Sequence, residues 1–421
     1  MSLAERWAKA GAGVRLVEGG ARLTLEALVE RAGQLASSMP EGPHVVVPRE
    51  VSELVAGLLA AELRGVPLVL VRPSEPLPEE GELARLPQGF AVATPTSGTT
   101  GRAKFALHSV ERLLGRVRPA RGDERPVWLL TFAPVSFAGL QVILSALETG
   151  TLVVAPPGTA PELVATAARE EGVTHVSGTP TFWRAFAMQF SAGSEGALPL
   201  KVATLGGERS SQATLDLVKA RFPRAKVGHI YATTETGSLF SVNDGREGFP
   251  RAWLEGGVEG VGLRVVDEEL WVKSPRAMRG YLGESNATAA SANAPEEGWI
   301  ATGDLVSLAE DRVLFVGRKG RIINVGGAKV DPEEVEALLH TVPGVADAFV
   351  FGRSNPITGT LVAAELVLAP GHAEAEVLAA VRSAFDGFVA GGLARYKAPR
   401  VLKVVPQLAL SSAGKKLRGA P

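Results

Sequence analysis

A run of hydroxyl-bearing residues and glycines, followed by a lysine, has the chemistry of a phosphate-binding loop. It separates an apolar stretch at residues 90–93 from an amphipathic one that begins near Ser109, so we predict a strand, the loop and then a helix. Glycines let the main chain approach a ligand closely, and consecutive N–H groups, hydroxyls and an ammonium group together bind anions. The spacing differs from the Walker pattern, and such a run taken alone is also typical of a surface turn. The residues of the run are Thr96, Ser97, Gly98, Thr99, Thr100, Gly101 and Lys104.

Two further motifs supply groups that a nucleotide needs. Tyr231, Thr234 and Glu235 lie at the end of a predicted strand, the edge at which open α/β sheets bind ligands. An aromatic ring can stack on a base, a hydroxyl can contact a phosphate, and a carboxylate can hold Mg²⁺. Asp304 stands in a Thr-Gly-Asp run and can accept both hydroxyls of a ribose. Such a run is more often an ordinary turn.

The last two motifs lie in the C-terminal part of the chain. Arg318 is followed a few residues later by Gly326 and Gly327. Lys415 and Lys416 follow a glycine close to the C-terminus, where lysines usually belong to a solvated tail. Each motif alone is a weak signal, but chance agreement of all five, in this order and at these separations, is very improbable.

The order of the predicted elements indicates an α/β fold. Strand-like stretches at residues 44–47, 68–71 and 127–130 alternate with helix-like stretches at residues 51–59 and 140–147. This alternation continues toward residue 230 and predicts a largely parallel sheet with helices on both faces. We therefore expect a large N-terminal domain built of layered α/β subdomains.

A change of pattern marks the end of this large domain. Residues 256–272 are rich in glycine and in short apolar stretches, which predicts a small β-appendage. A boundary falls near residues 317–320, and beyond it Asp331 can cap a helix that begins with a proline. The later stretches predict a compact C-terminal α+β domain. The expected domains are residues 1–318 and 319–421.

Composition limits the classes of function. The chain has 421 residues, with 44 Lys and Arg against 45 Asp and Glu, so a nucleic-acid partner is disfavoured. There is no cysteine, which rules out disulfides, thiolate metal sites and a catalytic thiol. We see no signal peptide and no membrane-spanning stretch, and expect a cytoplasmic protein.

Taken together, the five motifs resemble those of the adenylate-forming superfamily, which includes acyl- and aryl-CoA synthetases, adenylation domains and luciferases. The resemblance extends from about residue 23 to residue 418 and is most specific within the motifs. It implies an enzyme that uses ATP and Mg²⁺ to convert a carboxylic acid to an acyl-adenylate with release of pyrophosphate. It also implies coenzyme A as the acceptor and a mobile C-terminal domain.

The resemblance assigns a role to each nucleotide-binding motif. Residues 96–101 and Lys104 would hold the β- and γ-phosphates. Thr234 would contact the α-phosphate, and Glu235 would hold Mg²⁺. Asp304 and Arg318 would bind the ribose. The adenine slot would be formed by Gly206, Gly207, Glu208 and Tyr231.

The resemblance places the catalytic lysine in the C-terminal domain. Lys415 would bridge the carboxylate and the phosphate in the adenylation step, because it directly follows the glycine of the family motif. Gly326 and Gly327 would then meet the incoming thiol arm after the domain rotates. Gly320 stands at the usual Asp or Lys hinge position and can absorb a large torsional change.

Several positions depart from the family pattern. The stretch from residue 72 to residue 95 is short, so we expect a trimmed N-terminal subdomain with an altered substrate-facing wall. Ala103 replaces a common proline. Ala138 stands where a histidine is common in acyl-CoA synthetases, which puts the usual gate to the pantetheine tunnel in doubt.

The sequence indicates the class of the carboxylic acid substrate but not its identity. Residues 134–139 contain no acidic side chain, and this disfavours an α-amino acid, whose ammonium group usually meets an aspartate in this segment. A largely apolar pocket suits an aryl acid or a short to medium acyl acid. His229 can contact such a substrate, although a packed core histidine is the commoner role. The expected pocket residues are Phe137, Gly139, Thr181, Phe182, Thr204, Gly206, His229 and Thr236.

Three alternatives to coenzyme A transfer remain open at this stage. The acyl group can pass to a phosphopantetheinyl carrier protein or to an amine. The chain can also be a non-catalytic nucleotide-binding relative, although the presence of Lys415, Glu235 and Asp304 argues against that alternative.

Overall fold

The computed structural model describes residues 1–73, 75–96, 104–119, 124–155, 160–190, 198–282, 298–355 and 359–408. The chain forms two compact units. The larger one consists of Met1–Val266, Trp271–Thr302 and Leu308–Leu314, and the smaller one of Asp267–Leu270, Gly303–Ser307 and the described residues from Phe315 onward. A large layered α/β part and a small C-terminal α+β part confirm the predicted fold class.

The main sheet of the larger unit has the strand order β12-β11-β10-β9-β7-β8-β1-β2. The pairs from β1 through β8, β7, β9 and β10 to β11 are all parallel, as predicted, while β2 and β12 add antiparallel edges. The strands are β1 (Val14–Glu18), β2 (Ala21–Thr24), β7 (Val127–Leu130), β8 (Thr151–Val154), β9 (His175–Gly178), β10 (Val202–Gly206), β11 (Lys226–Thr233) and β12 (Gly237–Val242).

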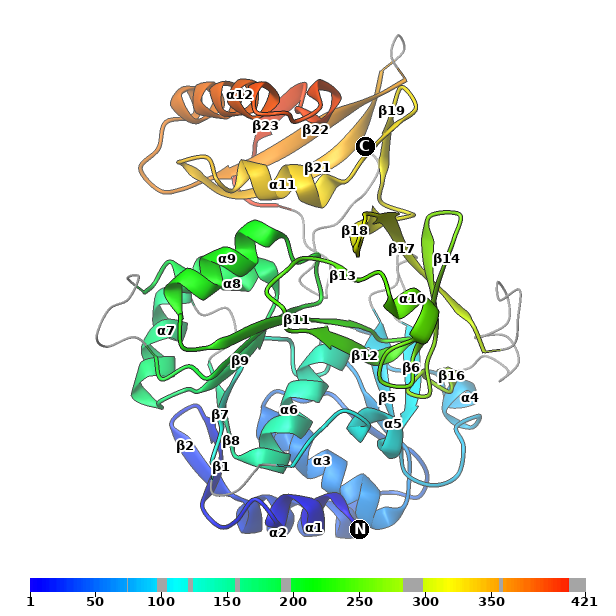
Figure 1. The fold of residues 1–421 in the computed structure, drawn as a ribbon. Coiled ribbons are helices and arrows are strands. Elements are labelled where there is room, and N and C mark those ends of the chain that lie inside the picture. Colours follow the sequence, from blue (N-terminus) through cyan, green and yellow to red (C-terminus); the bar gives the residue numbers. More distant parts are fainter. Residues whose placement is uncertain are drawn as a thin grey trace. The chain divides into compact units, whose positions relative to one another are not determined.

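Helices cover both faces of this sheet (Figure 1). Leu129 of β7 packs into a core with α7 (Pro161–Glu170), α8 (Pro180–Ala187) and α9 (Gln212–Arg221). Its neighbour Leu130 packs into the opposite core with α6 (Phe137–Thr149). Successive side chains of a strand point to opposite faces, so one apolar run serves both cores.

A second sheet of the larger unit has the order β16-β6-β5-β4-β3. Its strands are β3 (His44–Val46), β4 (Leu68–Leu70), β5 (Ala91–Thr96), β6 (Lys104–Ser109) and β16 (Gly280–Tyr281). Leu68, Leu70 and Val92 of this sheet share one buried core with α2, α3, α6 and strands of the main sheet, so helices lie between the two sheets. The helices of this part are α1 (Leu3–Ala8), α2 (Leu25–Ser38), α3 (Val51–Arg64), α4 (Glu80–Leu83) and α5 (Val110–Leu114).

The predicted order of strand, phosphate loop and helix is wrong in one respect, because a second strand lies between the loop and the helix. The helix expected near Ser109 is present, because Ser109 is the N-cap residue of α5. Before it, however, Lys104–Ser109 forms β6, which pairs antiparallel with β5. Phe105, Leu107 and His108 are all buried, so β6 is an inner strand without the polar alternation that identifies a strand in a sequence. Strands β5 and β6 are therefore the two arms of a β-hairpin.

The predicted β-appendage is a third sheet with the order β13-β18-β17-β15-β14. The elements of the appendage are β13 (Phe249–Pro250), α10 (Trp253–Gly256), β14 (Gly262–Val266), β15 (Glu269–Lys273), β17 (Ile300–Leu308) and β18 (Arg312–Arg318).

Among the described helices of the chain, none has the length and apolar character that a bilayer crossing requires.

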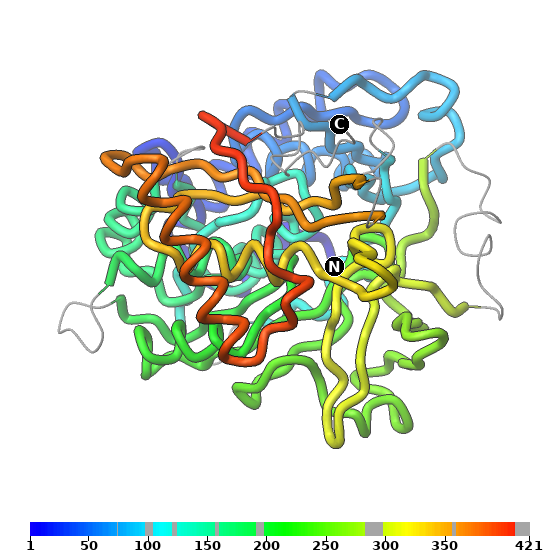
Figure 2. Tube along the Cα trace, turned by 90° about the horizontal axis from the view of Figure 1, so that it is seen from above, coloured from blue at the N-terminus to red at the C-terminus, as the bar shows by residue number. Residues whose placement is uncertain are grey.

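The smaller unit folds around its own core (yellow to red in Figure 2). As predicted, Asp331 caps α11 by accepting a hydrogen bond of 3.0 Å from the N–H of Glu333, with a proline at the first helical position. Its elements are the hairpin β19 (Ile323–Val325) and β20 (Ala328–Val330), α11 (Pro332–Leu339), β21 (Val345–Asn355), β22 (Gly359–Leu368), α12 (Glu374–Ala390), the 3₁₀ turn η1 (Arg395–Lys397) and β23 (Val401–Val404).

The start of α6 has no room for a side chain at Gly139. A Cβ atom there would lie 2.1 Å from the carbonyl oxygen of Ala133. We predict that Gly139→Ala lowers the free energy of unfolding by about 1–3 kcal/mol, measured by urea denaturation. Gly33→Ala on α2 is the control, because a Cβ there meets nothing within 4 Å. The control is expected to stabilise the protein by about 0.4–1 kcal/mol. Equal effects of the two substitutions would contradict the packing.

Candidate active site

The two ends of the phosphate loop are held by strand pairing. Thr96, the last residue of β5, is buried and lies opposite Lys104, the first residue of β6. The side chain of Lys104 is exposed. Ser97, Gly98, Thr99, Thr100, Gly101 and the catalytic candidate Lys415 lie outside the described residues.

The motif that contains Thr234 and Glu235 forms the turn between β11 and β12. The register of the two strands shifts between Tyr231 and Ala232, and such an irregularity re-aims the side chains that follow it. Within the turn, the N–H of Thr236 donates a hydrogen bond of 3.0 Å to the hydroxyl of Thr233, and the two hydroxyls are 2.8 Å apart. The turn therefore has a fixed conformation with Glu235 at its centre.

Tyr281 joins the phosphate loop to this turn. Its hydroxyl donates a hydrogen bond of 2.9 Å to a carboxylate oxygen of Glu235. The ammonium group of Lys104 lies 5.0 Å from the centre of the Tyr281 ring. Sequence reasoning missed Tyr281, because an uncharged residue in a short strand gives no local sign of these partners.

His108 lies beside Phe137, a residue of the expected acid pocket. Its buried ring lies 5.2 Å, centroid to centroid, from the ring of Phe137 at the start of α6. Burial lowers the pKa of His108 to about 4, and the main chain of Thr234 exerts a smaller opposing effect. The structure thus places beside Phe137 a neutral imidazole that sequence reasoning did not single out.

Glu208 and Thr181 also meet. The N–H and the hydroxyl of Thr181 donate hydrogen bonds of 3.1 and 2.8 Å to one carboxylate oxygen of Glu208. Glu208 follows Gly206, which ends β10, and Gly207, whose φ is +80°. A residue of the expected adenine slot and a residue of the expected pocket therefore lie together beyond the carboxyl end of β10.

Other expected pocket residues contribute to packing. The carbonyl of Thr204 accepts a hydrogen bond of 2.8 Å from the indole of Trp183, and the ring of Phe182 stacks on Phe186 at 5.0 Å. His229 is buried and donates to the carbonyl of Arg246 at 3.1 Å. Burial lowers the pKa of His229, so a neutral ring with a main-chain partner occupies this position.

In the smaller unit, the expected ribose ligands contact each other. A carboxylate oxygen of Asp304 accepts a hydrogen bond of 2.8 Å from Nε of Arg318. Glu269 supports this pair, because it accepts hydrogen bonds of 2.9 Å from the N–H of Gly303 and from the ammonium group of Lys319. The Thr-Gly-Asp run is thus part of strand β17 rather than a turn.

The two glycines of the C-terminal motif form a tight hairpin turn. Gly326 and Gly327 connect β19 and β20, with φ values of +56° and +90°. Positive φ at both central positions is typical of a two-residue type I′ turn, which strongly favours glycine. This explains the residue type without reference to a ligand.

The donor set suits Mg²⁺ that is shared with a nucleotide. Within the described residues there is no group of three or more His, Cys, Asp or Glu side chains placed to hold a metal. Mg²⁺ is usually bound by one or two carboxylates together with substrate phosphates rather than by a protein cage. Glu235, whose hydrogen-bond partner Tyr281 also contacts Lys104, fits that mode of binding.

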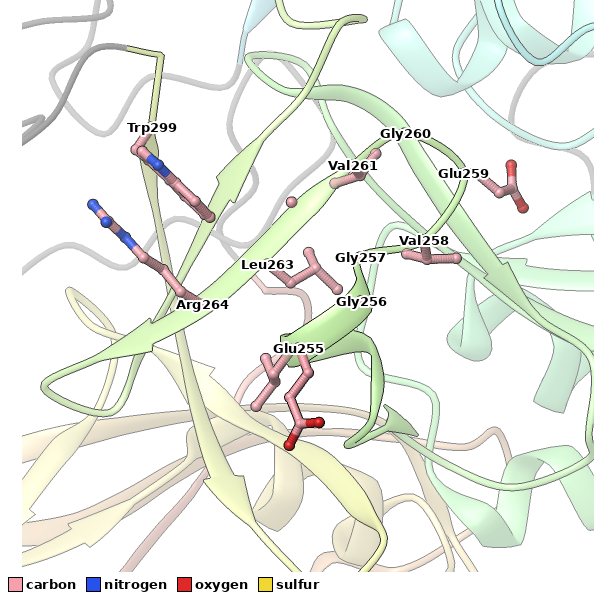
Figure 3. Close-up of a pocket in the computed structure, with 12 residues that line it drawn as sticks. Glu255, Gly256, Gly257, Val258, Glu259, Gly260, Val261, Leu263, Arg264 and Trp299 are labelled. Atoms are coloured by element: carbon pink, nitrogen blue, oxygen red, sulfur yellow. The ribbon is translucent and has the colours of Figure 1, made fainter.

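A separate cavity of about 540 Å³ lies in the β-appendage (Figure 3). It is lined by residues 254–264 and by Trp299, whose ring lies 4.2 Å from the guanidinium group of Arg264. The lining contains none of the expected site residues. The site inferred from the motifs is therefore distinct from this cavity.

Family comparisons cover most of the chain. The family model described as "AMP-binding enzyme" matches residues 42–282, and the one described as "AMP-binding enzyme C-terminal domain" matches residues 334–415. Among curated proteins, 4-coumarate-CoA ligase 2 of Narcissus pseudonarcissus is 29% identical over 310 residues, which is 66% of this chain and 53% of that protein. A 4-coumarate–CoA ligase of Oryza sativa subsp. japonica is 26% identical over 385 residues, which is 85% of this chain and 64% of that protein. The chain thus spans between half and two thirds of the length of these two relatives.

Solved structures share the fold. The o-succinylbenzoate CoA synthetase of Bacillus subtilis, in complex with its acyl-adenylate intermediate, superposes with a TM-score of 0.75 at 19% identity. That match covers 99% of this chain and 97% of the other. An anthranilate CoA ligase in complex with anthranoyl-AMP gives a TM-score of 0.77 at 18% identity, covering 99% of this chain and 96% of the other.

The buried imidazole of His108 leads to a prediction on pH. Its pKa is about 4 in the folded state and near 6.5 as an unperturbed group, so below pH 6.5 the unfolded chain takes up a proton that the folded protein does not. Stability contributed by His108 is therefore present above pH 6.5 and is lost toward pH 4, by at most about 1.4 kcal/mol per pH unit. Urea denaturation at pH 7, 6 and 5 is expected to show a shallower decline for His108→Leu than for the wild type.

The control is Leu130→Ala, which removes a buried side chain that does not titrate. It should lower the stability by a similar amount at each pH and keep the wild-type slope. A wild-type slope in His108→Leu would show that the histidine is solvated in solution.

Proposed function

The chain belongs to the family of AMP-binding enzymes, and from this premise we propose that it is an ATP-dependent acid–thiol ligase. It activates a carboxylic acid as an acyl-adenylate, releases pyrophosphate, and transfers the acyl group to the thiol of coenzyme A. The observation that carries the proposal is the contact of Tyr281 with both Lys104 and Glu235, because a cation and a carboxylate that share one neighbour suit a nucleotide with its Mg²⁺.

The reaction has two balanced steps. A carboxylate oxygen attacks the α-phosphorus of ATP, the bond to the β-phosphate oxygen breaks, and pyrophosphate leaves. The thiol then attacks the acyl carbon, loses its proton, and displaces AMP. Because carboxylate and triphosphate repel each other, the first step requires fixed positive charge near the phosphates.

The proposed roles follow from these demands. Lys104 and the loop hold the β- and γ-phosphates, Thr234 contacts the α-phosphate, and Glu235 holds Mg²⁺. When bound, Mg²⁺ neutralises phosphate charge as a Lewis acid. Lys415 provides the cation that joins the carboxylate to the α-phosphate.

The nucleoside part is assigned to two groups of residues. Tyr231 with Gly206, Gly207 and Glu208 forms the adenine slot. Asp304 accepts the ribose hydroxyls, while Arg318 holds its carboxylate in place through the 2.8 Å hydrogen bond.

The proposed substrate is an aryl acid or a short to medium acyl acid. Phe137, Phe182 and the buried His108 give the expected pocket an aromatic and neutral character. The names of the similar proteins support this choice, since they refer to 4-coumarate, o-succinylbenzoate and anthranilate. Coenzyme A is the proposed acceptor on the same grounds, with a carrier protein or an amine as the alternatives.

We further propose that residues 1–318 and 319–421 act as two domains. The smaller domain presents Lys415 for adenylation and then rotates about Gly320 to present the hairpin at Gly326 and Gly327 to the thiol arm.

A panel of acids tests the proposal. With purified full-length chain, ATP and Mg²⁺, at least one aryl or short acyl acid should give AMP and pyrophosphate. Adding coenzyme A should then give the acyl thioester. Release of ADP and phosphate would contradict the proposal for any acid. Thioester formation only with a phosphopantetheinyl carrier protein would change the assigned acceptor.

Lys415→Ala should slow acid-dependent exchange of pyrophosphate into ATP by about 10²–10³-fold, because a preorganised charge at the reacting groups is lost. Conversion of supplied acyl-adenylate to thioester should be retained. Lys416→Ala is the matched control and should keep most of the exchange activity. A large loss in Lys416→Ala alone would move the catalytic role to the neighbouring residue.

Gly320→Pro fixes φ at the proposed hinge. One half-reaction should persist while the other falls sharply, which requires adenylate formation and thiolysis to be measured separately. Equal and small effects on both steps would indicate a hinge elsewhere or no domain rotation.

A further inference from the structure

The short strand β16 and the residues just before it bond to two parts of the phosphate site. These are β6, which begins with Lys104, and the turn that contains Glu235. In β16, Gly280 and Tyr281 pair antiparallel with Leu107 and Ala106 of β6, the strand that follows the phosphate loop. Just before β16, the N–H of Met278 donates a hydrogen bond of 2.9 Å to the carbonyl of Glu235. Main-chain hydrogen bonds therefore fix the position of Tyr281 relative to β6 and to the turn.

The close approach on the side of the turn requires a glycine. Gly237 has a φ of +77°, and a Cβ atom there would lie 2.4 Å from the carbonyl oxygen of Arg276. The segment before β16 thus lies directly on the turn that contains Glu235. This packing leaves Tyr281 half-buried and limits its freedom to move.

We infer that Tyr281 is a positioning residue that fixes the ammonium group of Lys104 and the carboxylate of Glu235 relative to each other. Its hydroxyl orients the carboxylate of Glu235 for Mg²⁺, and its ring face holds the ammonium group of Lys104. The inference rests on the proposed function, because it assigns phosphate binding to Lys104 and metal binding to Glu235.

The two contacts act through different parts of one side chain. A hydrogen bond from the hydroxyl to one carboxylate oxygen fixes the carboxylate plane and leaves the other oxygen for a metal, as outer-shell partners of metal ligands do. The ring attracts the lysine through its quadrupole and needs no hydroxyl for this.

The two roles can be separated by substitution. Tyr281→Phe keeps the ring and removes the hydroxyl, whereas Tyr281→Leu removes both. Tyr396→Phe, at an exposed tyrosine of the smaller unit, is the matched control. Glu235→Gln and Lys104→Ala report the loss of each proposed ligand, and thermal denaturation checks that every variant is folded.

Metal binding is measured directly, without turnover. Mn²⁺ is titrated into enzyme saturated with α,β-methylene-ATP, and free Mn²⁺ is followed by electron paramagnetic resonance. We expect the Kd for Mn²⁺ to rise about 10–100-fold in Tyr281→Phe, the scale on which outer-shell partners act. Glu235→Gln should also bind Mn²⁺ more weakly, and Tyr396→Phe should match the wild type.

Binding of the same analogue with chelator present tests the second contact. Tyr281→Phe should bind it like the wild type, whereas Tyr281→Leu and Lys104→Ala should bind it more weakly. The expected loss for Tyr281→Leu is about 2–5-fold, on the scale of one exposed cation–π contact.

The outcomes are distinct. Wild-type Mn²⁺ affinity in Tyr281→Phe or in Glu235→Gln overturns the role of the hydroxyl. Equal analogue affinity in the phenylalanine and leucine variants overturns the role of the ring. Either result can occur while the wild type still exchanges pyrophosphate into ATP. Absence of that exchange with every acid would instead contradict the proposed function.

Discussion

Antiparallel pairing between β16 and β6 is the constraint on which the charged site depends. Lys104 begins β6, Glu235 lies in the β11–β12 turn, and the main chain before β16 donates to that turn. Lys104 and Glu235 each stand next to the end of a strand, where main-chain hydrogen bonds fix the position of the Cα atom. Tyr281 then contacts both side chains.

This arrangement suits a reaction between two anions. A phosphate chain requires positive charge on more than one side, and charges on flexible stems lose that advantage unless they are held in place. The histidine next to the expected acid pocket is also neutral. His108 is buried beside Phe137, and burial lowers its pKa to about 4, so its ring carries no charge at neutral pH.

Local rules were sufficient for most elements. Gly65 ends α3 in the left-handed conformation, and Asp331 caps α11, both as their residue types indicate. The buried parallel strands were found because they are continuous apolar runs. The inner strand β6 was missed, since its residues after Lys104 are buried on both faces and one of them is a histidine.

The candidate site was only partly predictable, for a different physical reason. The sequence motifs predicted Lys104 and Glu235, because a charged residue within a glycine- and threonine-rich stretch can be recognised from its neighbours in the sequence. Tyr281 and the contact of Glu208 with Thr181 depend on partners that folding brings from other strands and helices. No local pattern reports such pairs. Lys415 and residues 97–101 lie outside the described residues, and their roles remain predictions.

The central claim is that a carboxylate oxygen of the acid bonds to the α-phosphorus of ATP. The direct measurement uses an accepted acid whose carboxylate carries ¹⁸O, with ATP and coenzyme A, and follows the label by mass spectrometry. Adenylate formation predicts that one ¹⁸O atom per turnover appears in the phosphate of AMP. Label in inorganic phosphate with ADP as the nucleotide product, or thioester formed without label in AMP, would contradict the account.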